Sequence, residues 1–259
     1  MKNLFSLEGK KAVVMGGGGG IGQAIAQGLA EAGAEVVISS RKIEVLEKAR
    51  DEIKKNCGLE VHCITCDVSD EASVIAMKEE VLKLMGTVDI LVNSQGLNIK
   101  QPCYEFPVED WDKMFAVNVR GMMLTCKHFG QVMRDKHYGR IINISSIRGA
   151  RAVNGPLGNT GYASTKGAVD MMTKSLAGEW AKDGITVNAV GPILTMTEMM
   201  IPWKENNPEI YAKVSGSIPM GRLGEPEDCV GPAVFFASDA AAFVSGQIIY
   251  PDGASFCVG

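Results

Sequence analysis

The sequence predicts an α/β fold in which short strands alternate with longer helices. The expected strands are four to six residues long, rich in Val and Ile, and mostly continuous rather than alternating in polarity. Such runs are typical of strands buried on both faces, and strand–helix–strand repetition gives right-handed crossovers. We therefore expect a single-domain, Rossmann-type doubly wound sheet of about seven parallel strands with helices on both faces. The expected strands are 11–15, 35–39, 61–65, 88–92, 139–144, 185–190 and 247–250, and the main helices are 21–32, 43–56, 72–85, 111–136 and 162–183.

Length and composition are those of one globular unit. The chain has 259 residues and a net charge of −4, without a linker or internal repeat, so we expect one domain over 1–259. The least regular stretch is 192–219, which is rich in proline and methionine and is expected to form a substrate loop or lid.

The same composition argues against several classes of partner. No run of basic residues indicates a nucleic-acid or membrane surface, and no apolar run approaches the ~18 residues of a membrane span. The seven cysteines are scattered, and the Cys63-x-x-Cys66 pair lies in an expected strand without a His cluster nearby. We therefore expect no metal, ordinary thiols and a reducing, cytoplasmic location.

A glycine-rich segment directly follows the first expected strand and opens the first helix. Backbone N–H groups at a helix N-terminus hold phosphate, and glycines let the main chain approach it. Its position between a buried strand and an amphipathic helix predicts a dinucleotide site. The expected contacts are Gly16, Gly18, Gly19, Gly20, Ile21 and Gly22.

The end of the second expected strand indicates which dinucleotide binds. A site for NAD places a carboxylate there for the ribose 2′-hydroxyl, whereas a 2′-phosphate needs hydroxyls and a guanidinium. This sequence has Ser40 and Arg41 and no acid. NADP(H) is therefore favoured. NAD(H) stays possible, because Arg41 and Lys42 can also simply begin the next helix in solvent.

Tyr162-Ala163-Ser164-Thr165-Lys166, together with the glycine loop, makes the chain resemble the short-chain dehydrogenase/reductase family over essentially its full length. Met15, Gln95 and Ile193 depart from the family pattern. The resemblance implies a homotetramer or homodimer and a Ser–Tyr–Lys site. It assigns Asn118, Ser146, Tyr162 and Lys166 to catalysis, and Asp67, Val68, Asn93, Gly96, Tyr162, Lys166, Pro192 and Thr197 to the cofactor.

These residues define an acid–base mechanism. Lys166 lies four residues after Tyr162 on one helix face, so its ammonium is expected near the phenol oxygen, where it favours the phenolate. Tyr162 then exchanges a proton with the alcohol while hydride moves to or from the nicotinamide. Ser146 hydrogen-bonds the reacting oxygen, and Asn118 is expected to anchor a water that connects Lys166 to solvent.

The substrate is expected to be a small molecule that contacts Ser146, Tyr162, Arg148 and Arg151. Arginine suits a carboxylate, although this loop can also be merely solvated. The stretches 5–10, 179–182 and 250–253 resemble the gluconate 5-dehydrogenase and sugar-acid dehydrogenase branch. The expected reaction is therefore the interconversion of a secondary alcohol and a ketone on a sugar acid or polyol.

Three alternatives stay open. The first is a 3-oxoacyl-[acyl-carrier-protein] reductase, which needs a basic patch beside the active site. Arg120, Lys127 and Arg134 share one expected helix but fit a subunit interface better. The second is a general carbonyl reductase. The third is a regulatory protein that binds NADPH without turnover, and such a protein would usually lack one of the four catalytic residues.

Overall fold

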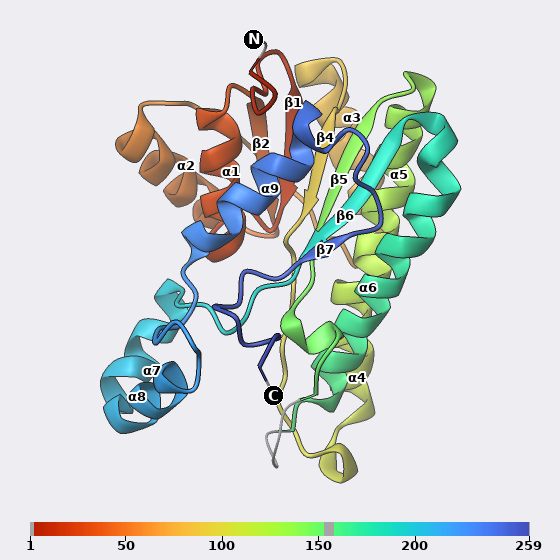
Figure 1. The fold of residues 1–259 in the computed structure, drawn as a ribbon. Helices are drawn as coiled ribbons and strands as arrows, with labels where there is room; N and C mark the ends of the chain where they lie inside the picture. The colour runs from red at the N-terminus through yellow and green to blue at the C-terminus, as the bar shows by residue number, and fades with distance from the viewer. Residues whose placement is uncertain (1–2, 153–157, 259) are drawn as a thin grey trace.

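The computed structural model describes residues 3–152 and 158–258. This part of the chain contains one parallel sheet with the strand order β3-β2-β1-β4-β5-β6-β7 (Figure 1). The order reverses between β1 and β4, which is the point where dinucleotides bind in doubly wound sheets. The predicted fold class is confirmed. The strands are β1 (Lys11–Met15), β2 (Glu35–Ser40), β3 (His62–Thr65), β4 (Ile90–Asn93), β5 (Gly139–Ile144), β6 (Ile185–Val190) and β7 (Ile248–Ile249).

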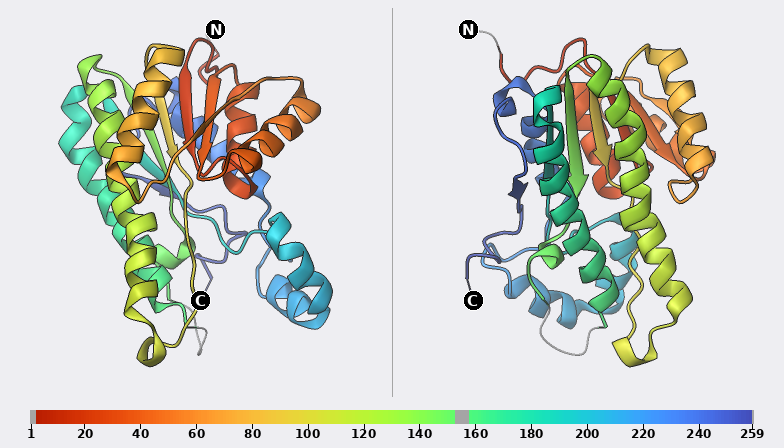
Figure 2. Two further views of the ribbon diagram at one scale, coloured as in Figure 1. Left: turned by 180° about the vertical axis from the view of Figure 1, so that it is seen from behind. Right: turned by 90° about the vertical axis from the view of Figure 1, so that its right-hand side faces the viewer.

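Helices cover both faces of the sheet (Figure 2). One face carries α1 (Gly20–Glu31), α2 (Ile43–Cys57) and α9 (Val230–Ala237). The other carries α3 (Glu71–Met85), α5 (Gly121–Asp135) and α6 (Thr160–Trp180). The remaining helices are α4 (Val108–Phe115), α7 (Ile201–Asn206) and α8 (Pro208–Gly216).

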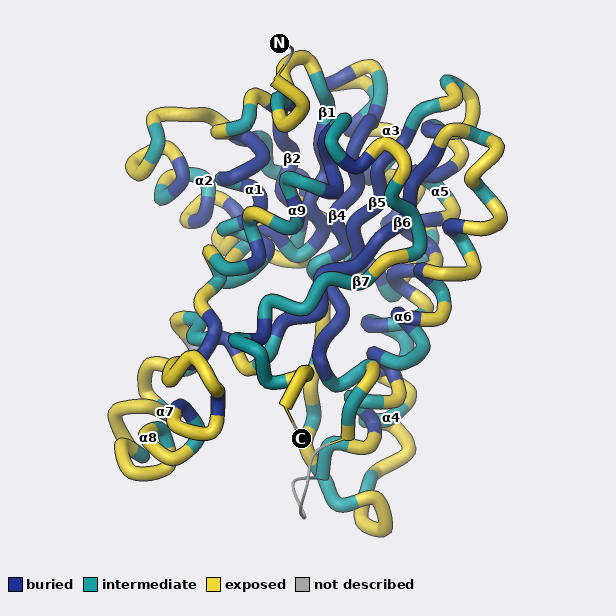
Figure 3. Tube along the Cα trace, in the orientation of Figure 1, coloured by how far each residue is buried: buried dark blue, intermediate teal, exposed yellow. Residues whose placement is uncertain are grey.

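Alternation along the strands divides the apolar residues between two cores. Val14 and Val92 pack under α1 and α9, whereas Val13 and Leu91 pack under α3 and α5. All four side chains are fully buried, and each such burial stabilises the fold by about 1.5–3 kcal/mol. The central strands are therefore buried along their length, as Figure 3 shows. The buried sheet therefore fixes the positions of the strand ends from which the candidate site residues extend.

The expected helix 111–136 is interrupted. The structure has α4, then a π-helical segment, Ala116–Arg120, and then α5, which together form a nearly continuous rod (Figure 2). A π-helical turn takes one residue more than an α-helical repeat, so apolar spacing does not reveal it in advance. The interruption contains Asn118, which is buried.

The segment 192–219, expected to be irregular, contains α7 and α8 after a 3₁₀ turn at Glu198–Met200. Pro202 and Pro208 lie in the first turns of the two helices. Proline is favoured at helix starts because the N–H that it lacks would have no partner within the helix. Both helices lie to one side of the sheet and are largely exposed (Figures 1 and 3).

Candidate active site

The turn between β1 and α1 requires glycine for two different reasons. Gly16 has a φ of 74°, and a Cβ there would lie 2.7 Å from the backbone nitrogen of Gln95. A Cβ on Gly22 would overlap with the carbonyl oxygen of Gly16. The N–H groups of Gly16 and Gly17 both donate to the Ser39 carbonyl, at 2.7 and 3.1 Å. The turn is thereby tied to the end of β2, and the N-terminus of α1 opens at the carboxyl edge of the sheet.

Ser40 and Arg41 lie beside this turn. The Ser40 hydroxyl is 3.3 Å from the position that a Cβ of Gly18 would take, and it donates to the Lys42 carbonyl at 3.3 Å. Arg41 is exposed. A hydroxyl, an exposed guanidinium and a helix N-terminus lined with glycine match the charge and size of the phosphates of NADP(H), so the residues present fit this group.

Asp67 and Val68 follow β3 at the same edge. The Asp67 carboxylate accepts hydrogen bonds from the Ser69 hydroxyl and N–H, at 2.6 and 2.9 Å. These bonds, and to a smaller extent the charge of Arg41, lower the pKa of Asp67. Val68 is buried against Gly121. Arg41 and Asp67 therefore belong to one charged border of the expected adenosine site.

Asn93, predicted to contact the cofactor, has a fully buried side chain. Its amide donates to Asn143 at 3.0 Å, and its oxygen accepts from Thr125 at 2.7 Å. Asn143 in turn donates to Thr173 at 2.9 Å. This network joins β4, β5, α5 and α6, so the Asn93 side chain holds the core together rather than facing the edge of the sheet. A polar residue at a strand end fits either role, and sequence alone does not distinguish them.

The Asn118 carboxamide is fully engaged with the protein. Its oxygen accepts from the Leu97 N–H at 2.7 Å, and its nitrogen donates to the Leu97 carbonyl at 2.8 Å and to the Thr165 hydroxyl at 3.0 Å. Gly96 lies close by, since a Cβ there would be 3.9 Å from the Asn118 oxygen. Asn118 thus connects the loop after β4 to the residue before Lys166.

Ser146 and Tyr162 meet where β5 and α6 converge. Ser146 caps a 3₁₀ turn, Ile147–Gly149, and its hydroxyl accepts the Arg148 N–H at 3.2 Å. Burial raises the pKa of Tyr162, whereas a hydrogen bond with Ser146 and the charge of Arg148 act in the opposite direction. The structure therefore brings the predicted pair into contact.

Lys166 is held by the backbone at the end of β5. Its ammonium donates to the Ile144 carbonyl at 2.7 Å and lies 5.5 Å from the centroid of the Tyr162 ring. Burial lowers the pKa of Lys166 to about 8, although the charge of Asp170 acts against this shift. The cation whose charge opposes the rise in the pKa of the Tyr162 phenol is Arg148.

The two arginines that were predicted to contact the substrate have different surroundings. Arg148 is half-buried and donates to the Ala152 carbonyl at 3.3 Å. Arg151 donates to the Ser255 carbonyl at 2.5 Å and to the Val258 carbonyl at 3.5 Å. Arg151 therefore ties the loop to the C-terminal segment. Arg148 is the arginine whose charge reaches Tyr162.

The segment that begins at Pro192 approaches both halves of the site. The Pro192 carbonyl accepts from the Ile147 N–H at 3.1 Å and from the Ser146 hydroxyl at 3.4 Å. The Thr197 methyl group lies 3.0 Å from the position that a Cβ of Gly20 would occupy. The segment thus starts beside Ser146 and passes over the N-terminus of α1.

Sequence reasoning overlooked Asp170, which is buried four residues after Lys166. The spacing alone could have revealed it, because positions i and i+4 share a helix face. Cys63 lies on β3 and Cys66 directly follows it, and the two pack into opposite cores. Within the described ranges, no group of three or more His, Cys, Asp or Glu side chains could hold a metal.

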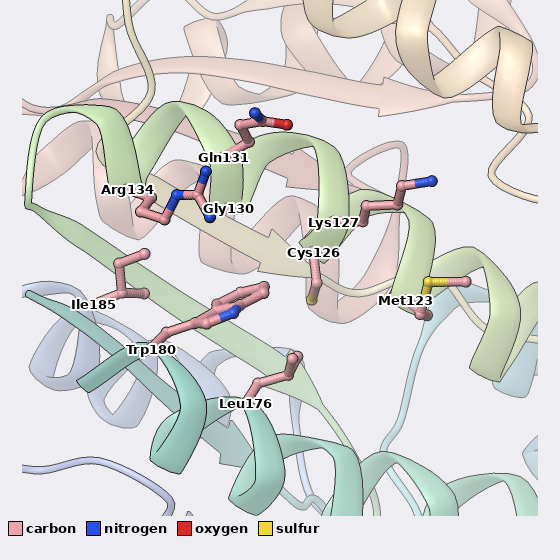
Figure 4. Close-up of a pocket in the computed structure, with 9 residues that line it drawn as sticks. All are labelled: Met123, Cys126, Lys127, Gly130, Gln131, Arg134, Leu176, Trp180 and Ile185. Atoms are coloured by element: carbon pink, nitrogen blue, oxygen red, sulfur yellow. The ribbon is translucent and has the colours of Figure 1, made fainter. Parts of the chain in front are cut away.

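A groove of about 300 Å³ lies between α5 and α6, away from these residues (Figure 4). The residues that line it include Met123, Gly130, Leu176 and Trp180, and the Trp180 ring points between the two helices.

None of the helices in residues 3–152 and 158–258 has the length and hydropathy that spanning a membrane requires.

Comparison with known proteins agrees with this geometry. A family model described as enoyl-(acyl carrier protein) reductase matches residues 16–254. A 2-dehydro-3-deoxy-D-gluconate 5-dehydrogenase of Pseudoalteromonas atlantica is 37% identical, over 98% of each chain. A gluconate 5-dehydrogenase of Gluconobacter oxydans is 35% identical, over 97% of this chain and 96% of its own.

A solved structure gives the same result in three dimensions. The gluconate 5-dehydrogenase of Burkholderia cenocepacia, in complex with NADP and tartrate, superposes with a TM-score of 0.91. It is 33% identical, and the match covers 99% of both chains. The glycine turn, the paired Ser146 and Tyr162 and these full-length matches lead to one conclusion: the chain belongs to the short-chain dehydrogenase/reductase family of oxidoreductases.

Proposed function

We propose that this protein is an NADP(H)-dependent oxidoreductase that interconverts a secondary alcohol and a ketone on a sugar acid or polyol. The observation that carries the proposal is the contact of Ser146 with Tyr162 at the same sheet edge as the glycine turn. Relatives named gluconate 5-dehydrogenase and galactitol 2-dehydrogenase, at 35% and 36% identity, support the substrate class. Ser40 and Arg41 support NADP(H), which is also bound in the Burkholderia structure.

NADPH, when bound, supplies the hydride for the ketone carbon. The Ser146 hydroxyl holds the ketone oxygen by a hydrogen bond, and Tyr162 delivers the proton to that oxygen as negative charge develops. Burial keeps the Tyr162 phenol protonated, ready to donate, while Arg148 limits how far its pKa rises. In the direction of alcohol oxidation, Tyr162 accepts the same proton. Lys166 and Asn118 hold the helix and loop that present Tyr162, and we propose that a water near Asn118 links Lys166 to solvent.

Arg148 gives a reason to favour a sugar acid over a neutral polyol. It is a half-buried cation beside Tyr162, and the hydrogen bond to the Ala152 carbonyl does not neutralise its charge. A buried charge is costly unless it is paired. A substrate carboxylate would supply that pairing with two parallel hydrogen bonds. Arg151 is proposed to act indirectly, by holding the loop.

A relative of another substrate class gives the second candidate. A 3-oxoacyl-[acyl-carrier-protein] reductase of Aquifex aeolicus is 34% identical over 97% of this chain. Against it, Lys127 pairs with Glu71 at 2.7 Å, which reduces the basic character of α5. A non-catalytic regulator is less well supported, because Asn118, Ser146, Tyr162 and Lys166 are all present. A general carbonyl reductase is less well supported because the similar proteins include sugar-acid and polyol dehydrogenases.

The experiment that tests the proposal combines one variant with a substrate panel. The purified protein is assayed with NADPH or NADP⁺ against gluconate-type acids, neutral polyols, simple ketones and acyl thioesters. We expect turnover on a sugar acid or polyol, lowered by ~10²-fold or more in Tyr162→Phe, while NADPH still quenches or shifts the fluorescence on binding. Turnover on thioesters alone would move the assignment to the second candidate. Wild-type turnover in Tyr162→Phe would refute the mechanism.

We also propose that residues 1–259 act as one catalytic domain, with 192–219 as its lid, and that the protein forms a homodimer or homotetramer in the cytoplasm. The groove between α5 and α6, which is lined in part by the 41% exposed Met123, supports contact with a second copy. The seven free cysteines fit a reducing compartment. Light scattering on wild type and on Met123→Glu tests the assembly, since a lower mass is expected for the variant.

A further inference from the structure

Asp170 is a buried carboxylic acid that the proposed mechanism does not use. It lies on α6, four residues after Lys166 and eight after Tyr162, and only 6% of it is exposed. Positions four and eight residues apart on a helix fall on one face, so the three side chains form a row along α6. A carboxylic acid at such a position is rarely buried without a partner.

The partner of Asp170 is the turn that carries Ser146. One carboxylate oxygen accepts a hydrogen bond from the Ser145 hydroxyl. The other is packed against Gly149, since a Cβ on Gly149 would overlap with it and would also approach the Lys166 carbonyl to 2.8 Å. Asp170 thus touches the residue before Ser146 and the residue after Arg148. It connects α6 directly to the turn that presents both side chains.

Charged and titratable groups lie around the Asp170 carboxyl on α6 itself, on the turn that carries Ser146 and on the chain that follows β7. Lys166 and Lys174 act on it from its own helix, and Tyr250 faces it from the chain that follows β7. Arg148, on the turn, acts on Tyr162. Burial raises the pKa of Asp170, while the Ser145 hydrogen bond and both lysines oppose that rise. Burial lowers the pKa of Lys166 to about 8, and the charge of Asp170 limits the fall.

We propose that Asp170 is a positioning residue for the reaction, which holds the Ser145–Gly149 turn against α6 and maintains the positive charge of Lys166 behind Tyr162. This inference rests on the proposed function of Ser146, Tyr162 and Lys166. It adds a fifth residue to Asn118, Ser146, Tyr162 and Lys166, and it gives a reason for glycine at position 149. It also explains why a lysine can stay charged in a fully buried position, since a neighbouring carboxylate offsets part of the cost of burial.

The test is the pH dependence of kcat/KM for alcohol oxidation in Asp170→Asn. Asparagine keeps the shape and an acceptor for Ser145 but removes the negative charge. Without that charge, Lys166 loses its proton more easily, and a neutral Lys166 no longer favours the Tyr162 phenolate, so the acidic limb of the profile should move to higher pH by about one unit. Ser145→Ala removes the bond that favours the carboxylate and should shift the limb in the same direction by less. This second variant keeps the test decisive if Asp170→Asn does not fold.

Asp89→Asn is the matched control. Asp89 is also buried, at 9% exposure, but it lies at the opposite edge of the sheet, where it accepts from the Lys11 N–H at 2.8 Å. This variant should lower stability and leave the pH profile in place. A lower melting temperature without a shifted limb in Asp170→Asn and Ser145→Ala would overturn the inference. If Tyr162→Phe also retained turnover, the proposed function itself would fail, so the two failures are distinguishable.

Discussion

Arg148 and Tyr162 are coupled through charge. Burial raises the pKa of the Tyr162 phenol, and a hydrogen bond with Ser146 and the guanidinium of Arg148 act against that rise. In turn, burial and the neighbouring Arg151 lower the pKa of Arg148, whereas Tyr162 raises it. Arg148 is therefore placed both to affect the pKa of Tyr162, which transfers the proton, and to pair with a carboxylate of the substrate.

Replacement of Arg148 by Gln tests this double role. The kcat/KM for a sugar acid should fall by about 10²-fold, because a charge-assisted pair is worth roughly 1.5–3 kcal/mol. For a neutral polyol the loss should be clearly smaller, since only the effect on Tyr162 remains. Steady-state kinetics on the two substrates give the comparison. An equal loss on both would show that Arg148 does not bind the carboxylate.

Arg41→Gln tests the choice of cofactor. The variant should weaken NADPH binding by about 10- to 100-fold and leave NADH binding unchanged, because only NADPH carries the 2′-phosphate. Fluorescence titration with each cofactor measures both constants. Lys42→Gln, which neutralises the next exposed residue, is the control and should change neither by more than a few fold. Similar losses for both cofactors would contradict the role of Arg41.

The glycine turn predicts a contrast between two alanine variants. Gly22→Ala places a methyl group against the Gly16 carbonyl and should destabilise the protein by about 1–3 kcal/mol. Gly19 has an extended backbone, with a φ of 171°, and open space around its Cβ position. Gly19→Ala should therefore leave the free energy of unfolding nearly unchanged. Urea denaturation of the cofactor-free protein distinguishes them, and equal stability would refute the close approach.

Lys166 predicts a change of stability with pH. Its pKa is about 8 in the folded protein, against an ordinary value of 10.5 for an exposed lysine, so the unfolded chain binds more protons between these values. Stability due to this group is lowest below pH 8 and rises as the pH increases toward 10.5. Relative to Lys166→Met, the wild type should gain on the order of 3 kcal/mol across that window. Urea denaturation at several pH values measures this gain, and a constant difference between the two proteins would show that burial does not lower the pKa of Lys166.

Regular elements could be predicted from the sequence because burial on both faces leaves a simple pattern. The bounds of β1, β5 and β6 agree with the expected ranges, since each is a short, mostly buried run rich in Val and Ile. The sequence does not predict α7 and α8, because proline usually marks irregular chain, whereas Pro202 and Pro208 begin helices. Local patterns predict where helices are allowed, and tertiary packing decides whether they form.

In the candidate site, too, local spacing predicted some features, whereas tertiary packing decided others. Spacing along one helix was enough to bring Tyr162 and Lys166 together, but it did not reveal that Lys166 donates to the Ile144 carbonyl. Nor could it reveal that Asn93 faces the core, because that contact depends on α5. Partners that come from distant parts of the chain are set by the packing of the sheet and helices, and a single sequence does not contain that geometry.

The π-helical segment Ala116–Arg120 has a consequence for how this molecule tolerates change. An extra residue in a helix shifts the angular phase of everything beyond it by about 100°. Asn118, inside the segment, bonds to Leu97 and Thr165, whereas Phe129, beyond it, packs in the core against the sheet. The rod is thus two halves joined out of phase, with the Asn118 contacts at the junction and the Phe129 contact in the second half. Deleting one residue there would restore ideal helical geometry and leave only one of the two halves correctly oriented.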